Sequence, residues 1–73
     1  MSADKIAHMA NQIALFMESK PHDEGITGFA SHINDFWEPR MRRQFFDLID
    51  RGGAGLRPLV LEAAAKVKRP QAA

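Results

Sequence analysis

The sequence contains no cysteine, which excludes disulfides and any site in which thiolates hold a metal ion or an iron–sulfur cluster. At 73 residues, the chain is near the size at which burial barely offsets the entropy lost on ordering. Domains this small usually gain stability from disulfides, a structural metal or a partner subunit. Since disulfides are excluded, a protein partner is the favoured source of added stability.

Long apolar runs are also lacking. The longest extends from Ile13 to Met17, far short of the roughly 20 residues that a membrane-spanning helix needs. The first five residues, MSADK, are polar and include an acid, unlike a signal or transit peptide. We therefore expect a soluble cytoplasmic protein that does not associate with a membrane.

Signals for β structure are absent as well. No window alternates apolar and polar residues with a period of two, whereas apolar residues recur at helical spacing in four segments. The sequence predicts an all-α fold, a small bundle of about four short helices. Residues 1–69 are expected to form one helical domain, and residues 70–73 a frayed, flexible C-terminal tail.

Capping residues and prolines set the expected helix boundaries. Ser2 suits the N-cap of a first helix that ends near Lys20, and acids at residues 23–24 favour the start of a second. Pro39 and Pro58 suit the first positions of the third and fourth helices. The side chains predicted to face the core are Ile6, Met9, Ile13, Phe16, Met17, Ile26, Phe29, Ala30, Ile33, Phe36, Trp37, Met41, Phe45, Leu48, Ile49, Leu59, Val60, Ala63 and Val67.

Residue types that carry catalysis or bind metals form no recognisable constellation. His8, His22 and His32 are not spaced as metal ligands on one helix, although residues 22–24 could hold a loose metal ion instead of being exposed polar side chains. The glycine-rich stretch 52–55 follows a predicted helix and lacks the Lys-Ser/Thr of a phosphate loop. We therefore predict no catalytic, cofactor-binding or metal-binding residue in this chain.

The charges are unevenly distributed. Residues 1–39 carry two Lys against six acids, a net −4, whereas residues 40–73 carry eight Lys or Arg against three acids, a net +5. This asymmetry is compatible with a nucleic-acid footprint, with two faces of a bundle meeting, or with a docking surface. The pI near 8.2 is too low to decide for nucleic acid, since domains that bind it usually have a pI above about 9.

The densest basic cluster, residues 40–43, lies beside Trp37 and indicates a protein interface, since Arg, Trp, Met and Phe are enriched there. Phosphate contact with base stacking and a solvated helix turn are the alternatives. One large apolar residue on each of three helices also falls outside the predicted core stripe, which suggests a second buried surface. The predicted partner-binding residues are Arg40, Arg42, Arg43, Phe46, Leu15 and Leu61.

Three blocks of the sequence indicate a protein family more specifically than composition and charge do. They are Met9-Ala10-Asn11-Gln12-Ile13, then His32-Ile33 through Phe36-Trp37-Glu38-Pro39-Arg40-Met41-Arg42, and Gly52-Gly53-Ala54-Gly55-Leu56 with Pro58-Leu59-Val60. In this order they resemble the delta subunit of soluble, molybdenum-dependent NAD formate dehydrogenases, through most of residues 5–65. Glu38 and Arg57 depart from the family pattern, which more often has Asp and an acid there. Neither departure touches an expected catalytic role.

The resemblance implies a noncatalytic subunit of a complex that oxidises formate to carbon dioxide and reduces NAD. In that family the alpha subunit holds the molybdenum cofactor and iron–sulfur clusters, while beta and gamma subunits pass electrons to FMN and NAD. The implied partner is the alpha subunit, and the implied role is stabilisation or assembly, with cofactor insertion or maturation as an alternative. The alternative hypothesis, outside this family, is a free-standing helical module that binds nucleic acid or forms a homodimer.

Overall fold

The computed structural model describes residues 2–70, and within that range the chain forms four α-helices followed by one 3₁₀ turn. The elements are α1 (Ala3–Met17), α2 (His22–Phe36), α3 (Pro39–Asp50), α4 (Pro58–Ala63) and the 3₁₀ turn Ala64–Lys66. No strand occurs among these residues, so the predicted all-α fold is confirmed. Of the predicted tail, residues 71–73 lie outside the described range. No helix in residues 2–70 is long and apolar enough to cross a membrane.

The helix ends follow the local signals in the sequence. The Ser2 hydroxyl accepts a hydrogen bond from the Lys5 amide at 3.3 Å, as an N-cap does. Pro39 and Pro58 are the first residues of α3 and α4, where a missing amide hydrogen costs nothing. After α3, Gly53 takes a positive φ of 68° and its amide bonds to a carbonyl of the helix, which ends α3 cleanly.

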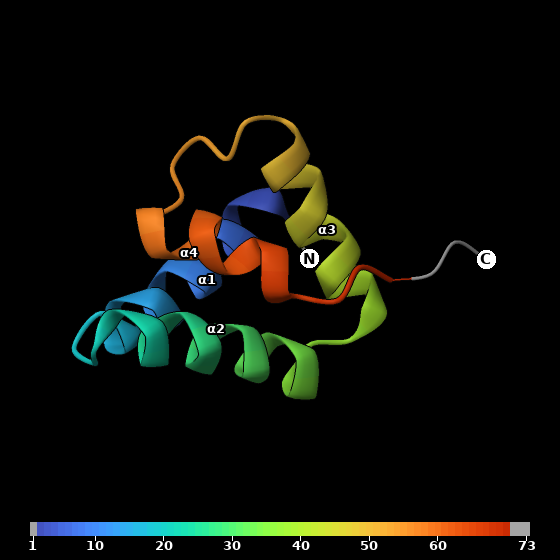
Figure 1. Ribbon diagram of the computed structural model, residues 1–73. Coiled ribbons are helices and arrows are strands. Elements are labelled where there is room, and N and C mark those ends of the chain that lie inside the picture. The colour runs from blue at the N-terminus through green and yellow to red at the C-terminus, as the bar shows by residue number, and fades with distance from the viewer. Residues whose placement is uncertain (1, 71–73) are drawn as a thin grey trace.

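Helix α1 is the central element. It contacts α2, α3 and α4, while α4 also packs on α2. Figure 1 shows α1 and α2 joined by a short turn and lying side by side, with α3 rising from the far end of α2 and α4 crossing the middle of the bundle. The inner positions of α1 are therefore surrounded on several sides, and its most buried residues are Ile6, Ala10 and Ala14.

The core is centred on aromatic rings contributed by α2, α3 and their junction. The fully buried Phe45 ring lies 6.2 Å from the Phe29 ring and 6.1 Å from Trp37, which it meets edge to face. Such arrangements favour the ring quadrupoles and add to the burial energy. The predicted burial of Ile33 and Trp37 is confirmed. The predicted inner side of the fourth helix is also confirmed, since Leu59, Val60, Ala63 and Val67 are all buried.

The prediction that Phe16 faces the core is wrong, because its side chain is 63% exposed. Three helices approach α1 closely, and small side chains at Ala10 and Ala14 occupy the centre of its inner face. The buried side is therefore rotated relative to the stripe that large apolar residues alone suggest. Phe16 falls outside this face and packs instead against Lys20, whose ammonium lies 5.2 Å from the ring centre.

Phe36 was predicted to be buried, and this prediction is wrong too, since 72% of it is exposed. Phe36 is the last residue of α2, and the next residue, Trp37, leaves the helix in an extended conformation. Trp37 thereby turns its ring into the core, while Phe36 stays on the outside and contacts the His32 ring at 4.9 Å.

Candidate functional site

The last described residues of the chain cross the outer side of α3. We call residues 66–70 the C-terminal strap. It lies over Arg42, Phe46 and Asp50, which are spaced four residues apart and so form one row along α3. Figure 1 shows the strap passing beside the start of α3 on its way to the C-terminus. The strap thus covers a stripe of α3 that helical periodicity assigns to solvent.

Each member of this row contacts the strap. The Nη1 atom of Arg42 donates a hydrogen bond to the Lys68 carbonyl at 2.8 Å. The guanidinium of Arg69 lies 4.2 Å from the centre of the Phe46 ring, and its two terminal nitrogens donate to the Asp50 carboxylate at 2.8 and 3.2 Å. Bonding to Arg69 holds the pKa of Asp50 below its usual range, and the same contact raises the pKa of Arg69.

The prediction that Phe46 points away from the core is therefore wrong, as only 5% of its surface is exposed. Phe46 packs edge to face on Phe45 at 5.3 Å, and the Arg69 guanidinium covers its other side. Arg42 is half-buried rather than free. Phe46 together with Arg42 was predicted to form an interface hot spot. In the structure an Arg side chain does lie on the Phe46 ring, but it is the exposed Arg69. The contact, however, is made with the chain's own strap, which has no helical periodicity to reveal it.

Arg40 and Arg43 lie outside this row of α3, and both are exposed. Within residues 2–70, no hydrogen bond or ion pair joins either guanidinium to another side chain. The structure thus divides the predicted basic cluster. Arg42 is used in folding, whereas Arg40 and Arg43 stay available to a partner, and their predicted role in binding remains a prediction.

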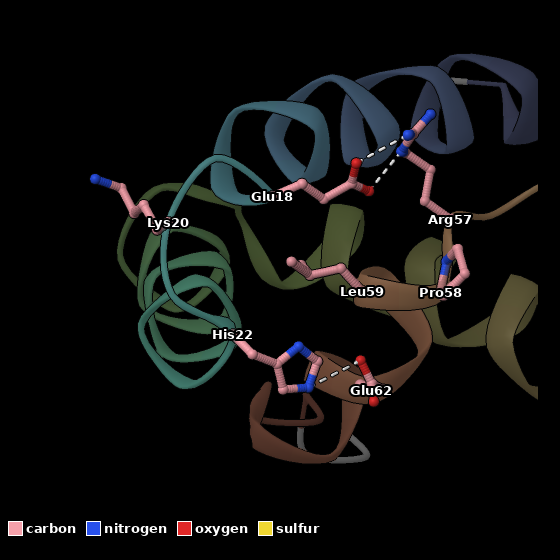
Figure 2. Close-up of a pocket in the computed structure, with 7 residues that line it drawn as sticks. All are labelled: Glu18, Lys20, His22, Arg57, Pro58, Leu59 and Glu62. Atoms are coloured by element: carbon pink, nitrogen blue, oxygen red, sulfur yellow. Dashed lines mark hydrogen bonds and ion pairs between the residues drawn. The ribbon is translucent and has the colours of Figure 1, made fainter.

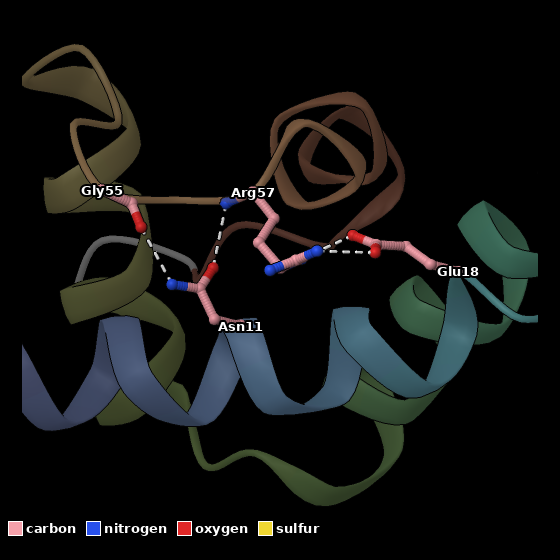
Figure 3. A network of polar contacts seen from close by, with 4 residues as sticks. All are labelled: Asn11, Glu18, Gly55 and Arg57. Atoms are coloured by element: carbon pink, nitrogen blue, oxygen red, sulfur yellow. Dashed lines mark hydrogen bonds and ion pairs between the residues drawn. The ribbon is translucent and has the colours of Figure 1, made fainter.

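A second polar network fastens the glycine-rich connector to α1, and Figure 3 shows its members. The Asn11 side chain donates to the Gly55 carbonyl and accepts from the Arg57 amide, both at 2.9 Å. The Arg57 guanidinium binds Glu18 through two hydrogen bonds of 2.6 and 2.8 Å. These bonds keep the pKa of Glu18 below its usual range and raise that of Arg57. Arg57, at a departure from the family pattern, is therefore an internal clamp in this chain.

The predicted partner-binding residue Leu15 lies on the outer side of α1, three residues before Glu18 and four after Asn11. Its side chain is 54% exposed, and it stands next to the exposed Phe16. Leu15 and Phe16 point about 100° apart around α1, so each exposes a large apolar side chain on its own side of the last turn. The exposure of Phe16 was not predicted from the sequence. Ala10 and Ala14, which occupy the inner face of α1 instead of Phe16, are the signal that could have revealed it.

Leu61 lies on α4 and is 43% exposed, at the edge of an open groove of about 360 Å³ between α3 and the end of α4. The groove is lined by Phe46, Ile49, Leu61, Ala64, Ala65, Val67 and Arg69. Leu15 and Leu61 therefore both have the exposure predicted for them. Whether either binds a partner remains a prediction.

Another hollow, of about 490 Å³, lies between the end of α1 and the start of α4 (Figure 2). Both of its carboxylates have a basic neighbour. Glu18 binds Arg57, and the Nε2 atom of His22 lies 3.4 Å from Glu62, an ion pair whenever the imidazole is protonated. In residues 2–70, no group of three or more His, Asp or Glu side chains is arranged to hold a metal ion. The hollow therefore offers no assembled nucleophile or metal centre.

Residues 5–64 of the chain match the protein family described as NADH-dependent formate dehydrogenase delta subunit FdsD. The matched range covers all of α2, α3 and α4 and most of α1, and it includes the three blocks on which the sequence resemblance rests. No curated protein and no solved structure matches the chain.

Proposed function

Because the chain belongs to the NADH-dependent formate dehydrogenase delta subunit family, we propose that it is a noncatalytic accessory subunit that binds and stabilises, or helps assemble, the multisubunit enzyme. The observation that carries this proposal is the family match over residues 5–64, nearly the whole folded part of the chain. A small helical chain that belongs to a family of enzyme subunits is expected to act by binding other proteins.

Several features support a noncatalytic role. The sequence has no cysteine to ligate an iron–sulfur cluster or a molybdenum cofactor through sulfur. Among residues 2–70, no Asp, Glu, His or Lys residue is buried, so none of these groups has the strongly desolvated surroundings that tune catalytic acids and bases. In this proposal the molybdenum cofactor, iron–sulfur clusters, FMN and NAD are all held by other subunits.

We further propose that the partner is the alpha subunit, in the cytoplasm, within a complex that also contains beta and gamma subunits. The exposed apolar side chains Leu15, Phe16 and Leu61 support a docking role, since each is a large apolar surface that the fold itself leaves uncovered. The free cations Arg40 and Arg43 can add electrostatic complementarity to such a contact.

The test is co-purification. A tagged copy of this chain, expressed in cells that make the other formate dehydrogenase subunits, should retain the alpha subunit through size-exclusion chromatography. Removing the gene for this chain should lower the yield or thermal stability of the assembled enzyme. If the tagged chain elutes without any formate dehydrogenase subunit, the proposed function is wrong.

The same experiment separates a resident subunit from a maturation factor. A resident subunit is recovered in a fixed ratio with the active, cofactor-loaded enzyme. A maturation factor is instead enriched on alpha subunit that lacks its cofactor, and is absent from the finished enzyme.

A further inference from the structure

An exposed row of charged side chains runs along α3. At about 100° per residue, Arg40, Arg43, Asp47 and Arg51 fall within a sector of about 80° around the helix axis, and all four are exposed. Arg51 is the C-cap residue, but its amide still bonds to the Asp47 carbonyl, so it continues the row. We call these four residues the α3 charge row. It is distinct from the row that the C-terminal strap covers.

The arginines of the chain divide between folding and this row. Of the six arginines, Arg42, Arg57 and Arg69 each donate a hydrogen bond to another part of the fold. The other three all belong to the α3 charge row, and within residues 2–70 none of them forms an ion pair or a side-chain hydrogen bond. In the same range, Asp47 lies one helical turn from two of these arginines and pairs with neither. The charges of the row are therefore left for a contact outside the fold.

The stability of α3 does not account for Arg40. The first turns of α1 and α2 contain acids, which suit the positive end of the helix dipole, whereas the first turn of α3 contains Arg40 and no acid. A cation at this end of a helix is unfavourable, and Arg40 has no ion pair within the described residues to offset the cost. Its position therefore lowers the stability of α3, and a binding role explains it better than a structural one.

The order of charges along the row indicates what kind of partner fits it. Two arginines are followed by an acid and then by a third arginine, so three positive charges against one negative charge give a net +2. A nucleic acid presents phosphates along its whole backbone, so Asp47 would be repelled wherever the arginines are satisfied. A protein surface can instead place carboxylates opposite the arginines and a basic side chain opposite Asp47. The row therefore favours an acidic protein face of mixed charge over a polyanion.

We propose that the α3 charge row docks an acidic face of a formate dehydrogenase subunit, with carboxylates against its three arginines and a basic side chain against Asp47. The inference rests on the proposed accessory function and names the surface and the charge pattern of the partner face that fits it. Arginine pairs with a carboxylate through two parallel hydrogen bonds, so the row orients its partner as well as attracting it. Because the row has no large apolar side chain, its main effect is on the rate of association and on the salt dependence of that rate.

Biolayer interferometry of the full chain on the alpha–beta–gamma assembly, at several salt concentrations, tests this assignment. We expect an Arg40→Glu, Arg43→Glu double variant to associate at least about tenfold more slowly than the wild type at low salt, with a weaker salt dependence. Asp47→Arg should also slow association, because the new cation meets the basic side chain of the partner. The double variant should melt at the wild-type temperature or above it, since a glutamate suits the first turn of α3. Slower association of such a variant is then a binding defect and not a folding defect.

Two control variants make the same changes of charge elsewhere on the molecule. Lys66→Glu, Lys68→Glu changes the net charge as much as the double arginine variant does, and Asp35→Arg matches Asp47→Arg near the end of another helix. All three of these residues are exposed and form no ion pair within residues 2–70. The lysine variant should slow association clearly less than the arginine variant, and Asp35→Arg should not slow it.

Several outcomes would overturn this assignment while leaving the proposed function intact. They are equal slowing by the two double variants, wild-type kinetics in the arginine variant, or faster association of Asp47→Arg. A nucleic-acid duplex that only the chain with its arginines binds would assign the row to that ligand, and a dimer of the free chain that the arginine variant dissociates would assign it to a second copy. A wild-type chain that binds no formate dehydrogenase subunit would instead refute the proposed function itself.

Discussion

Asn11 and Asn34 make the same pair of hydrogen bonds at two separate places in the bundle. Each carboxamide donates to the carbonyl of one residue and accepts from the amide two residues later, so it grips a short extended stretch of backbone. The residue in the middle of each gripped stretch, Leu56 or Val67, is buried. The two asparagines thus fasten the connector and the strap over the core.

We expect Asn34→Ala to loosen the strap. The variant loses the bonds to the Lys66 carbonyl (3.2 Å) and from the Lys68 amide (2.8 Å). Two hydrogen bonds of this kind are worth about 1–2 kcal/mol of unfolding free energy together. Urea denaturation followed by circular dichroism measures the loss. Asp35→Ala changes the exposed neighbour and should leave stability nearly unchanged.

Hydrogen exchange locates the effect of that substitution. The Lys68 amide should exchange faster in Asn34→Ala, whereas the Val67 amide, which bonds to the Ala64 carbonyl at 3.1 Å, should keep more of its protection. Unchanged exchange at Lys68 would show that Asn34 does not hold the strap.

The helices were largely predictable because their signals are local. Prolines at the starts of α3 and α4 and glycines after α3 mark boundaries without reference to the rest of the fold. The burial of Phe46 was not predictable in this way, because it depends on a non-helical strap more than 20 residues later in the sequence. A pattern read along α3 alone contains no information about that contact.

Phe16 and Phe36 show two other limits. The inner face of α1 is set by how closely its neighbours approach, which favours Ala10 and Ala14 over the larger Phe16. Phe36 has an acceptable helical phase, but its helix ends there and Trp37 takes the inner position. The clamps Asn11 and Asn34 were missed because an asparagine on a helix gives no sign of which distant backbone it binds.

Two glycines of α2 should respond in opposite ways to replacement by alanine. A β-carbon on Gly25 would lie 2.6 Å from the Met17 carbonyl oxygen, which is backbone and cannot move without shifting the turn between α1 and α2. On Gly28, the nearest atom is the Met17 sulfur at 2.9 Å, the end of a flexible side chain. We expect Gly25→Ala to destabilise by about 1–3 kcal/mol, as overpacking does.

Gly28→Ala should be neutral or stabilising by up to about 1 kcal/mol, because alanine is the better helix former. Thermal melting of both variants gives the comparison. Equal melting temperatures for the two would contradict the close approach of α2 to the Met17 carbonyl.

The decrease in the free energy of unfolding at acidic pH should depend on Arg57. Hydrogen bonding to Arg57 lowers the pKa of Glu18 in the folded state. The resulting stabilisation is fully present above the unfolded carboxyl pKa of about 4, and it is lost as pH falls through the lower folded-state pKa. In Arg57→Gln the Glu18 pKa should rise toward its ordinary value, and the loss of stability below about pH 4 should become shallower.

NMR titration of the Glu18 carboxyl group, with urea denaturation at several acidic pH values, measures both effects. Arg51→Gln is the control, because Arg51 is also exposed and forms no ion pair within residues 2–70. A Glu18 pKa that stays the same in Arg57→Gln would show that this ion pair does not persist in solution.

Phe46→Ala and Phe36→Ala remove the same side chain from opposite environments. Phe46 is 5% exposed and packs on Phe45 beneath Arg69, so its loss leaves a cavity and removes a ring contact. Phe to Ala in a core costs about 3–5 kcal/mol, which is comparable with the whole stability of a domain this small. We expect Phe46→Ala to lose most of its helicity, whereas Phe36→Ala, at 72% exposure, should melt within a few degrees of the wild type.

The Phe46→Ala variant also tests partner binding, because the sequence predicted that Phe46 contacts the partner. A folded Phe46→Ala chain that has lost only its partner would place this ring at the interface and show that the strap moves aside on binding. If Phe46→Ala unfolds alone but folds when co-expressed with the formate dehydrogenase subunits, the ring belongs to the core and the partner supplies the missing stability. Circular dichroism of the free variant, followed by co-purification, distinguishes the two, and we expect the second result because Phe46 is covered by the strap before any partner arrives.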